Sequence, residues 1–530
     1  MAVDVEVRGR ALPGRTSLKE RPLALALETA LIAALAVATR LPFRTRYLMN
    51  WDAAQFALGL NQFDVVHHQP HPPGYIGYLA LGRLFELFIP DPNAALVVLS
   101  IAGESLAVVI GFLFASSLFG RFAGWVTALA MVSSPLFWYY GEVANNYALE
   151  PVLTLAIAWL TWRLWTGDER YADRAAIAIG LAGALRPSTA LMMLPLFLLA
   201  LPRACSRPAA VRALALLVVA AAAWVIPLCL AAGGPLRLAS ASFQLGGSDT
   251  SGTAIWSAGF NGLLTTANAV LTGIGWELGL FAVLALFGLA VAPRLLRTEL
   301  PVKSWGLFCW AWAAPSLLVY LFVHIGQVVY VQTFIPAIFL SLGPAVAATA
   351  LAVGRPALAP VLAAICLAAN LALFFSPDHS GLAQQLRLHD LRVESLRSTV
   401  TGLGPPERTV LLSDAWATGS YRSTQVYLPA YHRVAVEHDL RGRLGEIYGD
   451  TYEPWRFAQA RQPEYPATAT TYVFLDQDLI GFVGDRQHLR RLVLADGSRI
   501  WVWQGAEPTL FANRFWLEPP SGKLTPPRAS

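Results

Sequence analysis

Long apolar segments recur along the chain and restrict it to one class of fold. A helix that crosses the hydrocarbon core of a bilayer needs about 20 apolar residues, and segments of this length recur from residue 23 to residue 376. Only 14% of the 530 residues are charged, whereas a soluble domain carries about 25%. We therefore predict a mainly α, polytopic transmembrane bundle of about 10–12 helices.

Two of the predicted segments depart from a simple span. Residues 74–89 are too short and too charged to cross the bilayer, and we expect an amphipathic helix that lies in the interface. Residues 174–202 are interrupted by Arg186-Pro187, which predicts two half-helices. The remaining apolar helices are predicted at 23–40, 94–118, 122–139, 147–166, 211–232, 270–292, 304–324, 329–352 and 356–376.

The distribution of basic residues predicts how the chain lies across the membrane. Residues 1–22 form a basic tail that should stay in the cytoplasm, before a first helix that is retained rather than cleaved. The segments 41–93 and 233–268 then become outer loops, and Glu142 lies in an outer turn. A rival arrangement, in which 74–89 spans the membrane and 174–202 is one unbroken helix, would move Glu142 to the cytoplasmic face.

The composition changes after residue 376, where charges become frequent. Residues 377–518 are predicted to form a soluble α/β domain outside the membrane, followed by a disordered tail, 519–530. The last two strands flank Asp496-Gly497, a hairpin signal. The expected strands are Thr409 to Leu412, Arg433 to Val436, Thr471 to Leu475, 491–495 and 499–503.

The outer loop 41–93 contains the first candidates for chemistry. A carboxylate just outside the bilayer, such as Asp52, could deprotonate a hydroxyl group. It could equally cap the helix predicted at 53–61, and the two roles do not exclude each other. The nearby His67, His68 and His71 could bind a metal, but exposed loop histidines are commoner, so we predict no metal site.

Charged residues inside the apolar region are the second group of candidates. An Arg at the centre of a membrane helix costs about 2.5–3.5 kcal/mol, so Arg186 should face a cavity or a partner. It could hold an anionic phosphate group, or it could snorkel at a helix break. Glu142 and Asn146 lie in a turn that is either functional or simply interfacial. Glu104 should pair with another helix.

The absence of several sequence motifs disfavours some classes of function. The chain has no GxxxxGK[ST] phosphate loop, no HExxH and no convincing GxSxG elbow, which disfavours ATP-driven transport and metalloprotease chemistry. The pI near 9.0 does not indicate nucleic-acid binding, since the basic residues lie mostly between apolar blocks. The four cysteines have no paired spacing and favour packing roles.

The order of the polar motifs resembles that of a known superfamily. Trp51-Asp52, His71-Pro72-Pro73-Gly74-Tyr75, Glu142 and Arg186-Pro187 follow one another along the chain. This order resembles the GT-C membrane glycosyltransferases, especially the protein O-mannosyltransferase and aminoarabinose-transferase branch, over residues 23 to 350. The resemblance implies a polyprenyl-phosphate-linked sugar donor, transfer outside the membrane with inversion, and a multi-pass protein of the bacterial inner membrane.

The resemblance also implies roles for individual residues. Asp52 corresponds to the acidic residue of the first outer loop, which is assigned to base catalysis or to orientation of the acceptor. Glu142 corresponds to a second acidic or polar position, and Arg186 to a cation that neutralises the phosphate leaving group. Asp52 is followed by two alanines and not by a second acid, and no Asp-x-Asp motif stands at the second loop. The resemblance therefore does not favour a metal-dependent mechanism. We predict no cofactor, with a divalent metal as the alternative. The expected donor- or acceptor-binding residues are Trp51, His67, His68, His71, Tyr75, Glu142, Asn146 and Arg186.

Two other functions fit the same sequence. A lipid or sugar transporter would not depend on Asp52, and it would have little use for a large outer domain. A lipid-linked polysaccharide polymerase or ligase would use a lipid-diphosphate donor. The sequence does not indicate whether the acceptor is a protein, a lipid or a glycan.

Overall fold

The computed structural model describes residues 5–7, 10–11, 22–295, 297–298, 302–377, 381–414, 421–438, 444–448, 454–456, 465–483, 486–506 and 508. The chain forms two compact units. The helical unit comprises residues 1–44 and 72–384, and the sheet unit comprises residues 45–71 and 385–530. The segment 45–71, which carries Asp52, therefore belongs with the C-terminal residues and not with the helices that flank it.

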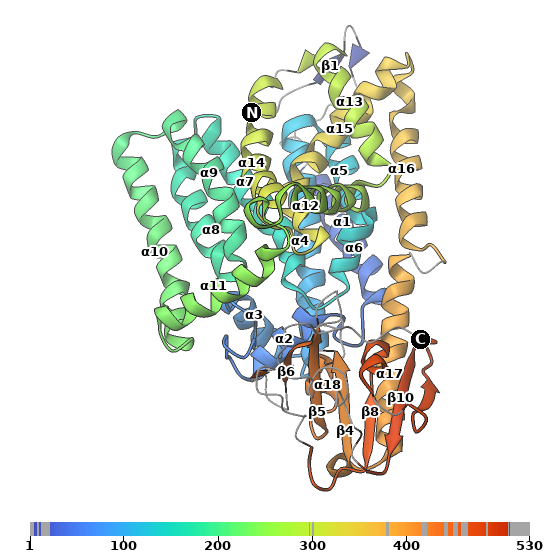
Figure 1. The fold of residues 1–530 in the computed structure, drawn as a ribbon. Coiled ribbons are helices and arrows are strands. Elements are labelled where there is room, and N and C mark those ends of the chain that lie inside the picture. Colours follow the sequence, from blue (N-terminus) through green and yellow to red (C-terminus); the bar gives the residue numbers. More distant parts are fainter. Residues whose placement is uncertain are drawn as a thin grey trace. The chain divides into compact units, whose positions relative to one another are not determined.

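The helical unit is a bundle of long helices (Figure 1). α4 and α15 are mostly buried, whereas α1, α10 and α16 are mostly exposed, so the first two form the centre of the bundle. The helices are α1 (Pro22–Arg40), α3 (Ile76–Glu86), α4 (Pro92–Phe119), α5 (Arg121–Ser133), α6 (Pro135–Gly141), α7 (Glu150–Trp165), α8 (Ala172–Leu185), α9 (Pro187–Ala204), α10 (Arg207–Ala231), α11 (Pro235–Ser251), α12 (Ile255–Leu278), α13 (Phe281–Leu295), α14 (Val302–Phe322), α15 (Ile335–Ala352) and α16 (Ala359–Phe374).

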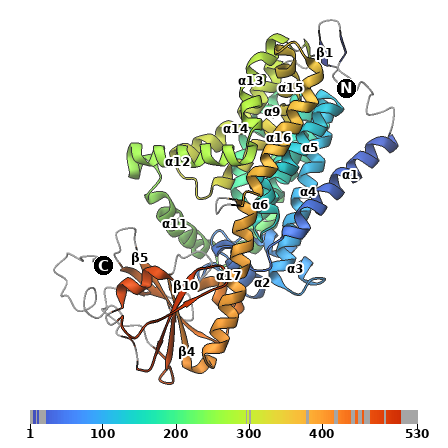
Figure 2. The same ribbon diagram turned by 90° about the vertical axis from the view of Figure 1, so that its right-hand side faces the viewer.

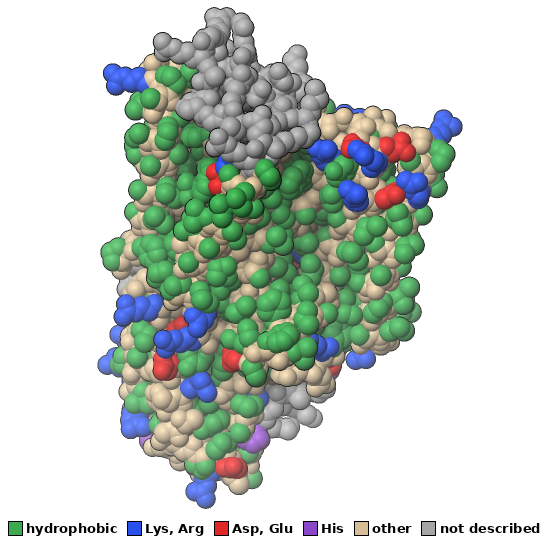
Figure 3. Space-filling model, turned by 180° about the vertical axis from the view of Figure 1, so that it is seen from behind, with side chains coloured by type: hydrophobic (Ala, Val, Ile, Leu, Met, Phe, Trp, Pro, Cys, Tyr) green, Lys and Arg blue, Asp and Glu red, His purple; other side chains and the backbone are tan. Residues whose placement is uncertain are grey.

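The surface of the helical unit is apolar. In the face that Figure 3 shows, hydrophobic side chains cover a broad continuous area, and charged side chains gather near its upper end. Among the described helices, seven are long and apolar enough to cross a bilayer, and α12 with α13 would form an eighth as a bent pair. An apolar surface of this extent needs lipid around it, and the predicted polytopic bundle is confirmed.

The helix break predicted at Arg186-Pro187 is confirmed. Arg186 has an extended backbone between α8 and α9, with φ of −155° and ψ of 99°, and Pro187 is the first residue of α9. A proline lacks the N–H that a continuous helix would use, but it is well tolerated in the first turn. The break leaves the Arg186 side chain at the junction of two helices.

Residues 233–292 contain more helix than expected, and one prediction for them is wrong. The stretch expected as an outer loop contains α11 and the start of α12, because a proline after two glycines begins a helix there. The single helix expected at 270–292 is two helices bent by 94°. Gly279 has a φ of 52° at the break, a conformation that glycine adopts readily. In Figure 2, α12 lies across the direction of α14 and α16.

The sheet unit has the predicted α/β character. Its seven strands follow the order β7-β6-β5-β4-β8-β10-β9, with β4 parallel to β5 and β8 and the other pairs antiparallel. Its elements are α2 (Trp51–Asn61), α17 (Leu382–Leu403), β4 (Thr409–Asp414), α18 (Tyr421–Tyr427), β5 (His432–His438), β6 (Leu444–Tyr448), β7 (Pro454–Arg456), β8 (Thr471–Phe474), β9 (Arg490–Val493) and β10 (Arg499–Gln504).

Alternate residues of the central strands fill the two faces of this sheet. Leu412 and Phe474 pack on one face, whereas Leu411 and Val473 pack on the other, against Val400 of α17. This alternation is the period of two that a strand imposes. Figure 2 shows α17 beside the sheet. The predicted tail 519–530 lies outside the described residues.

Candidate functional site

The candidate base, Asp52, lies in the first turn of α2. The cap of this helix is Asn50, whose Oδ1 atom accepts a hydrogen bond of 2.9 Å from the N–H of Ala53. The alternative that Asp52 caps the helix is therefore wrong. The Asp52 side chain is 23% exposed, and the first turn of a helix favours a negative charge.

Asp52 lies beside His71, and both belong to the sheet unit. The Oδ1 atom of Asp52 is 3.7 Å from Nδ1 of His71. The same Nδ1 atom is 2.7 Å from Oε1 of Gln55, which is fully buried. Gln55 was not among the predicted site residues, although it lies three positions after Asp52 and so projects from the same helix face.

The protonation of His68 determines how Gln55 is oriented. Burial lowers the pKa of His68 to about 3, reinforced by the charges of His71 and Arg422, so its ring is neutral. The Nδ1 atom of His68 lies 3.5 Å from Nε2 of Gln55 and can accept a hydrogen bond from that amide. Gln55 then presents Oε1 to Nδ1 of His71, which donates its N–H to that oxygen.

His67 has a structural partner in the same loop. Its Nδ1 atom lies 2.6 Å from Oδ2 of Asp64. Burial alone would raise the pKa of Asp64, but hydrogen bonds from His67 and Val66 outweigh it and lower the pKa. Asp64 and Gln69 also exchange two backbone hydrogen bonds of 2.7 Å. Among the described residues, no three His, Cys, Asp or Glu side chains are grouped to hold a metal ion.

The helical unit pairs Arg186 with a carboxylate that was not predicted. The Nε atom of Arg186 lies 2.5 Å from Oε2 of Glu150, at the start of α7. The other Glu150 oxygen accepts hydrogen bonds from Thr189 (2.8 Å) and Thr333 (2.9 Å). The guanidinium carbon is also 4.4 Å from the Tyr147 ring centroid and 4.7 Å from that of Tyr330, distances typical of cation–π contacts.

Three further predicted residues lie in the helical unit. Tyr75 precedes α3 with a φ of 40° and is among the groups that interact electrostatically with Arg186. Glu142 is fully buried, and its Oε1 atom accepts a 2.5 Å hydrogen bond from Nε1 of Trp138. Asn146 is also buried, and its Nδ2 atom has no hydrogen-bond partner in the described part of the chain.

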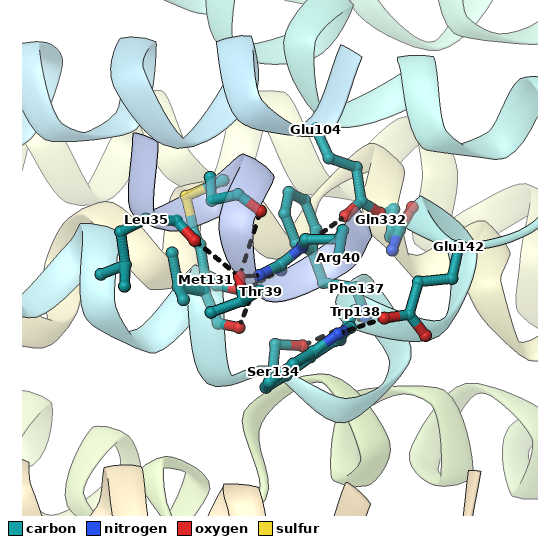
Figure 4. Close-up of polar contacts among 12 residues, drawn as sticks. Leu35, Thr39, Arg40, Glu104, Met131, Ser134, Phe137, Trp138, Glu142 and Gln332 are labelled. Carbon is teal, nitrogen blue, oxygen red and sulfur yellow. Dashed lines mark hydrogen bonds and ion pairs between the residues drawn. The ribbon is translucent and has the colours of Figure 1, made fainter. Parts of the chain in front are cut away.

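Sequence reasoning missed a buried charge cluster around Glu142. Arg40, at the end of α1, lies 3.5 Å from Glu104 of α4, so Glu104 does pair with another helix as predicted. Figure 4 shows Arg40 and Glu104 pointing toward each other, beside Trp138 and Glu142. Glu277 of α12 is also fully buried and bonds Ser134 and Gln332. The sequence did contain a signal for this cluster, since each of these charged residues stands in an apolar segment, where charges usually pair with one another.

The predicted residues therefore fall into two groups. The sheet unit brings Asp52 and His71 together with Trp51, His67 and His68, and the helical unit holds Tyr75, Glu142, Asn146 and Arg186.

Comparison with solved structures identifies similar folds. ArnT from Cupriavidus metallidurans in the apo state is 11% identical, with a TM-score of 0.51, and the match covers 92% of this chain and 98% of that one. The same protein bound to undecaprenyl phosphate is 12% identical over the same shares, with a TM-score of 0.49.

An oligosaccharyltransferase from Archaeoglobus fulgidus is also similar, at 14% identity and a TM-score of 0.47. The match covers 78% of this chain but 64% of that one, so this chain spans less than two thirds of that protein. No protein-family model matches the sequence, and no curated protein sequence matches it. Because the similarity to apo ArnT extends over nearly the full length of both chains, the chain has the fold of that protein.

Proposed function

We propose that the protein is an integral-membrane glycosyltransferase that moves a sugar from a polyprenyl-phosphate-linked donor to an acceptor outside the membrane. The fold shared with ArnT supports the general class. The observation that carries the proposal is the partly exposed Asp52 carboxylate beside His71, whose ring is held by buried Gln55. A carboxylate in this setting can reach a polar acceptor and take its proton.

Asp52 acts as the general base in this mechanism. Its carboxylate accepts the proton of the acceptor as the acceptor atom bonds the anomeric carbon of the sugar. The bond between that carbon and the phosphate oxygen breaks on the opposite face, and polyprenyl phosphate leaves with the electron pair. One carboxylate is enough for such an inverting displacement, and no nucleotide-binding motif is needed.

Arg186 stabilises the phosphate that leaves. Glu150 forms an ion pair with Nε of Arg186. We propose that the two Nη groups of Arg186 donate hydrogen bonds to the phosphate oxygens. A guanidinium fixed in advance costs little reorganisation when charge develops on the leaving group. Tyr75, Glu142 and Asn146 are proposed to bind the donor or the acceptor, as are Trp51, His67, His68 and His71.

Sugar transfer by the purified protein in nanodiscs tests this function. Donors would be synthetic sugars on undecaprenyl phosphate, with release of the lipid phosphate as the readout, in the presence and absence of a chelator. Asp52→Asn should lower release by about 10²–10⁴-fold if Asp52 is the base. The matched control is Asp168→Asn, because Asp168 is 22% exposed and pairs with the exposed Arg170. This variant should leave the rate unchanged.

Each other outcome has a definite meaning. Full activity of a well-folded Asp52→Asn variant would remove Asp52 as the base. Release only from a lipid-diphosphate donor would replace this donor assignment with that of a polymerase or ligase. Transport of labelled lipid into sealed vesicles without any transfer would replace the enzyme with a transporter. Loss of activity with the chelator would show that a divalent metal takes part.

A further inference from the structure

Side chains from the C-terminal part of the sheet unit bind the backbone of the segment that leads to Asp52. Asp390 of α17 accepts hydrogen bonds from the N–H groups of Arg46 (2.9 Å) and Tyr47 (3.3 Å). At Leu48, the hydroxyl of Tyr427 accepts from the N–H (2.7 Å) and Nε2 of His389 donates to the carbonyl (3.0 Å). Two backbone groups of Leu48 are thus fixed by residues more than 340 positions away.

A buried arginine forms a hydrogen bond near the other end of the segment 45–71. Arg422 of α18 is fully buried, and its Nη2 atom donates a 2.8 Å hydrogen bond to the carbonyl of His67. Its Nη1 atom donates to Gln425 at 2.9 Å. A buried guanidinium that lost such a carbonyl partner would carry an uncompensated desolvation cost, so this contact restrains the loop strongly.

Arg422 also contacts the start of α2. The guanidinium carbon lies 5.3 Å from the centroid of the Trp51 ring, and the rings of Trp51 and Tyr421 are 6.3 Å apart. Trp51 directly precedes Asp52, and His67 stands four positions before His71. Arg422 therefore touches both parts of the chain that set the distance between Asp52 and His71.

We propose that Arg422 is a positioning residue, which bonds the His67 carbonyl and the Trp51 ring and thereby holds Asp52 and His71 at their reactive spacing. This inference rests on the proposed function for its activity readout. It gives the C-terminal part of the chain a role in catalysis without any contact with the substrate. A displacement of about 1 Å at a reacting group can cost about 10²-fold in rate, so the restraint affects kcat.

Arg422→Gln and Arg422→Lys test the proposal in the full-length protein. Glutamine removes the charge, whereas lysine keeps the charge but not the planar fork that bonds two partners at once. The matched control is Arg433→Gln. Arg433 is also a buried arginine of the sheet unit, and it bonds the carbonyls of Leu428 and Pro429.

Two readouts separate positioning from general stability. Hydrogen–deuterium exchange should rise in peptides covering 45–71 for Arg422→Gln but not selectively for Arg433→Gln. The kcat for sugar transfer should fall by about 10²-fold with KM changed much less, and Arg422→Lys should restore part of it. If Arg422→Gln does not fold, Arg422→Lys and Trp51→Phe are measured in the same way.

The possible failures are distinguishable. Unchanged exchange over 45–71 together with unchanged kcat would overturn the positioning role. Equal effects of Arg433→Gln on both readouts would also overturn it, because they would indicate a general loss of stability. If the wild-type protein transfers no sugar from any donor, the proposed function fails, while the exchange experiment still decides whether Arg422 restrains the loop.

Discussion

The Nε atom of Arg186 lies 2.5 Å from Oε2 of Glu150, and the two side chains are 6% and 2% exposed. Removal of one member of a buried ion pair leaves an uncompensated charge and costs about 3–5 kcal/mol. We therefore expect Glu150→Gln to lower the free energy of unfolding by about this amount. Denaturation in detergent, followed by tryptophan fluorescence, measures the change.

The double variant provides the control for this prediction. Arg186→Met with Glu150→Leu removes both charges, and it should be closer to wild type than either single variant. A double-mutant cycle with a coupling energy near zero would show that the pair does not act as a unit. The double variant should in any case lose sugar transfer if Arg186 binds the phosphate.

Gln55 offers a second test, at the histidine beside the proposed base. Gln55→Leu removes the acceptor of the His71 Nδ1–H, so the ring loses its fixed tautomer and orientation. We expect kcat to fall by about 10-fold or more, since general base catalysis needs this geometry. Gln62→Leu is the matched control because Gln62 is exposed at the end of the same helix. Equal rates for both variants would argue against a role for Gln55.

The helices could be predicted because their signals are local. Apolar length determines the spans, and the chemistry of proline predicted the break at Arg186-Pro187. Asp496-Gly497 likewise predicted the hairpin of β9 and β10. The strands β6 and β7 were missed because runs of five and three residues are too short for a clear alternation of apolar and polar residues.

Contacts between distant residues could not be predicted in this way. Arg422 and His67 are 355 positions apart, and neither stands in a pattern that indicates the other. The pairing of Arg186 with Glu150 depends on how α7 and α9 pack, which no local periodicity specifies. Asp52, His71 and Arg186 were identified as single residues, but Gln55, Glu150 and Arg422 emerge only from the fold.

A fall in pH should weaken the contact between His389 and the backbone of Leu48, in the segment before Asp52. Burial lowers the pKa of His389 to about 4, with Arg392 acting in the same direction, while the Leu48 carbonyl and Asp496 oppose the shift. The pKa of a histidine in an unfolded chain is about 6.5. Between pH 4 and pH 6.5 the unfolded state therefore binds more protons than the folded state. The stability that His389 contributes is therefore complete above about pH 6.5 and is lost as the pH falls toward 4.

A variant without the titratable ring checks this pH dependence. His389→Gln keeps a donor for the Leu48 carbonyl but does not titrate. Between pH 7.5 and pH 5, the wild type should lose more of its exchange protection at residues 45–50 than His389→Gln does. Parallel losses in the two proteins would mean that other groups cause the pH dependence.

The indole of Trp138 is one partner of the buried Glu142 carboxylate. Nε1 of Trp138 donates a 2.5 Å hydrogen bond to Oε1 of Glu142, and Trp138→Phe removes this donor while it keeps an aromatic ring. A buried acceptor that loses its partner costs about 1–3 kcal/mol, and more when it is charged. We expect a decrease of at least this size in the free energy of unfolding. Trp125→Phe is the matched control, because Trp125 packs edge-on against Phe112 in the same unit. If both variants lose the same stability, ring volume rather than the bond to Glu142 explains the loss, and Glu142 must then find its stabilisation elsewhere in the buried charge cluster.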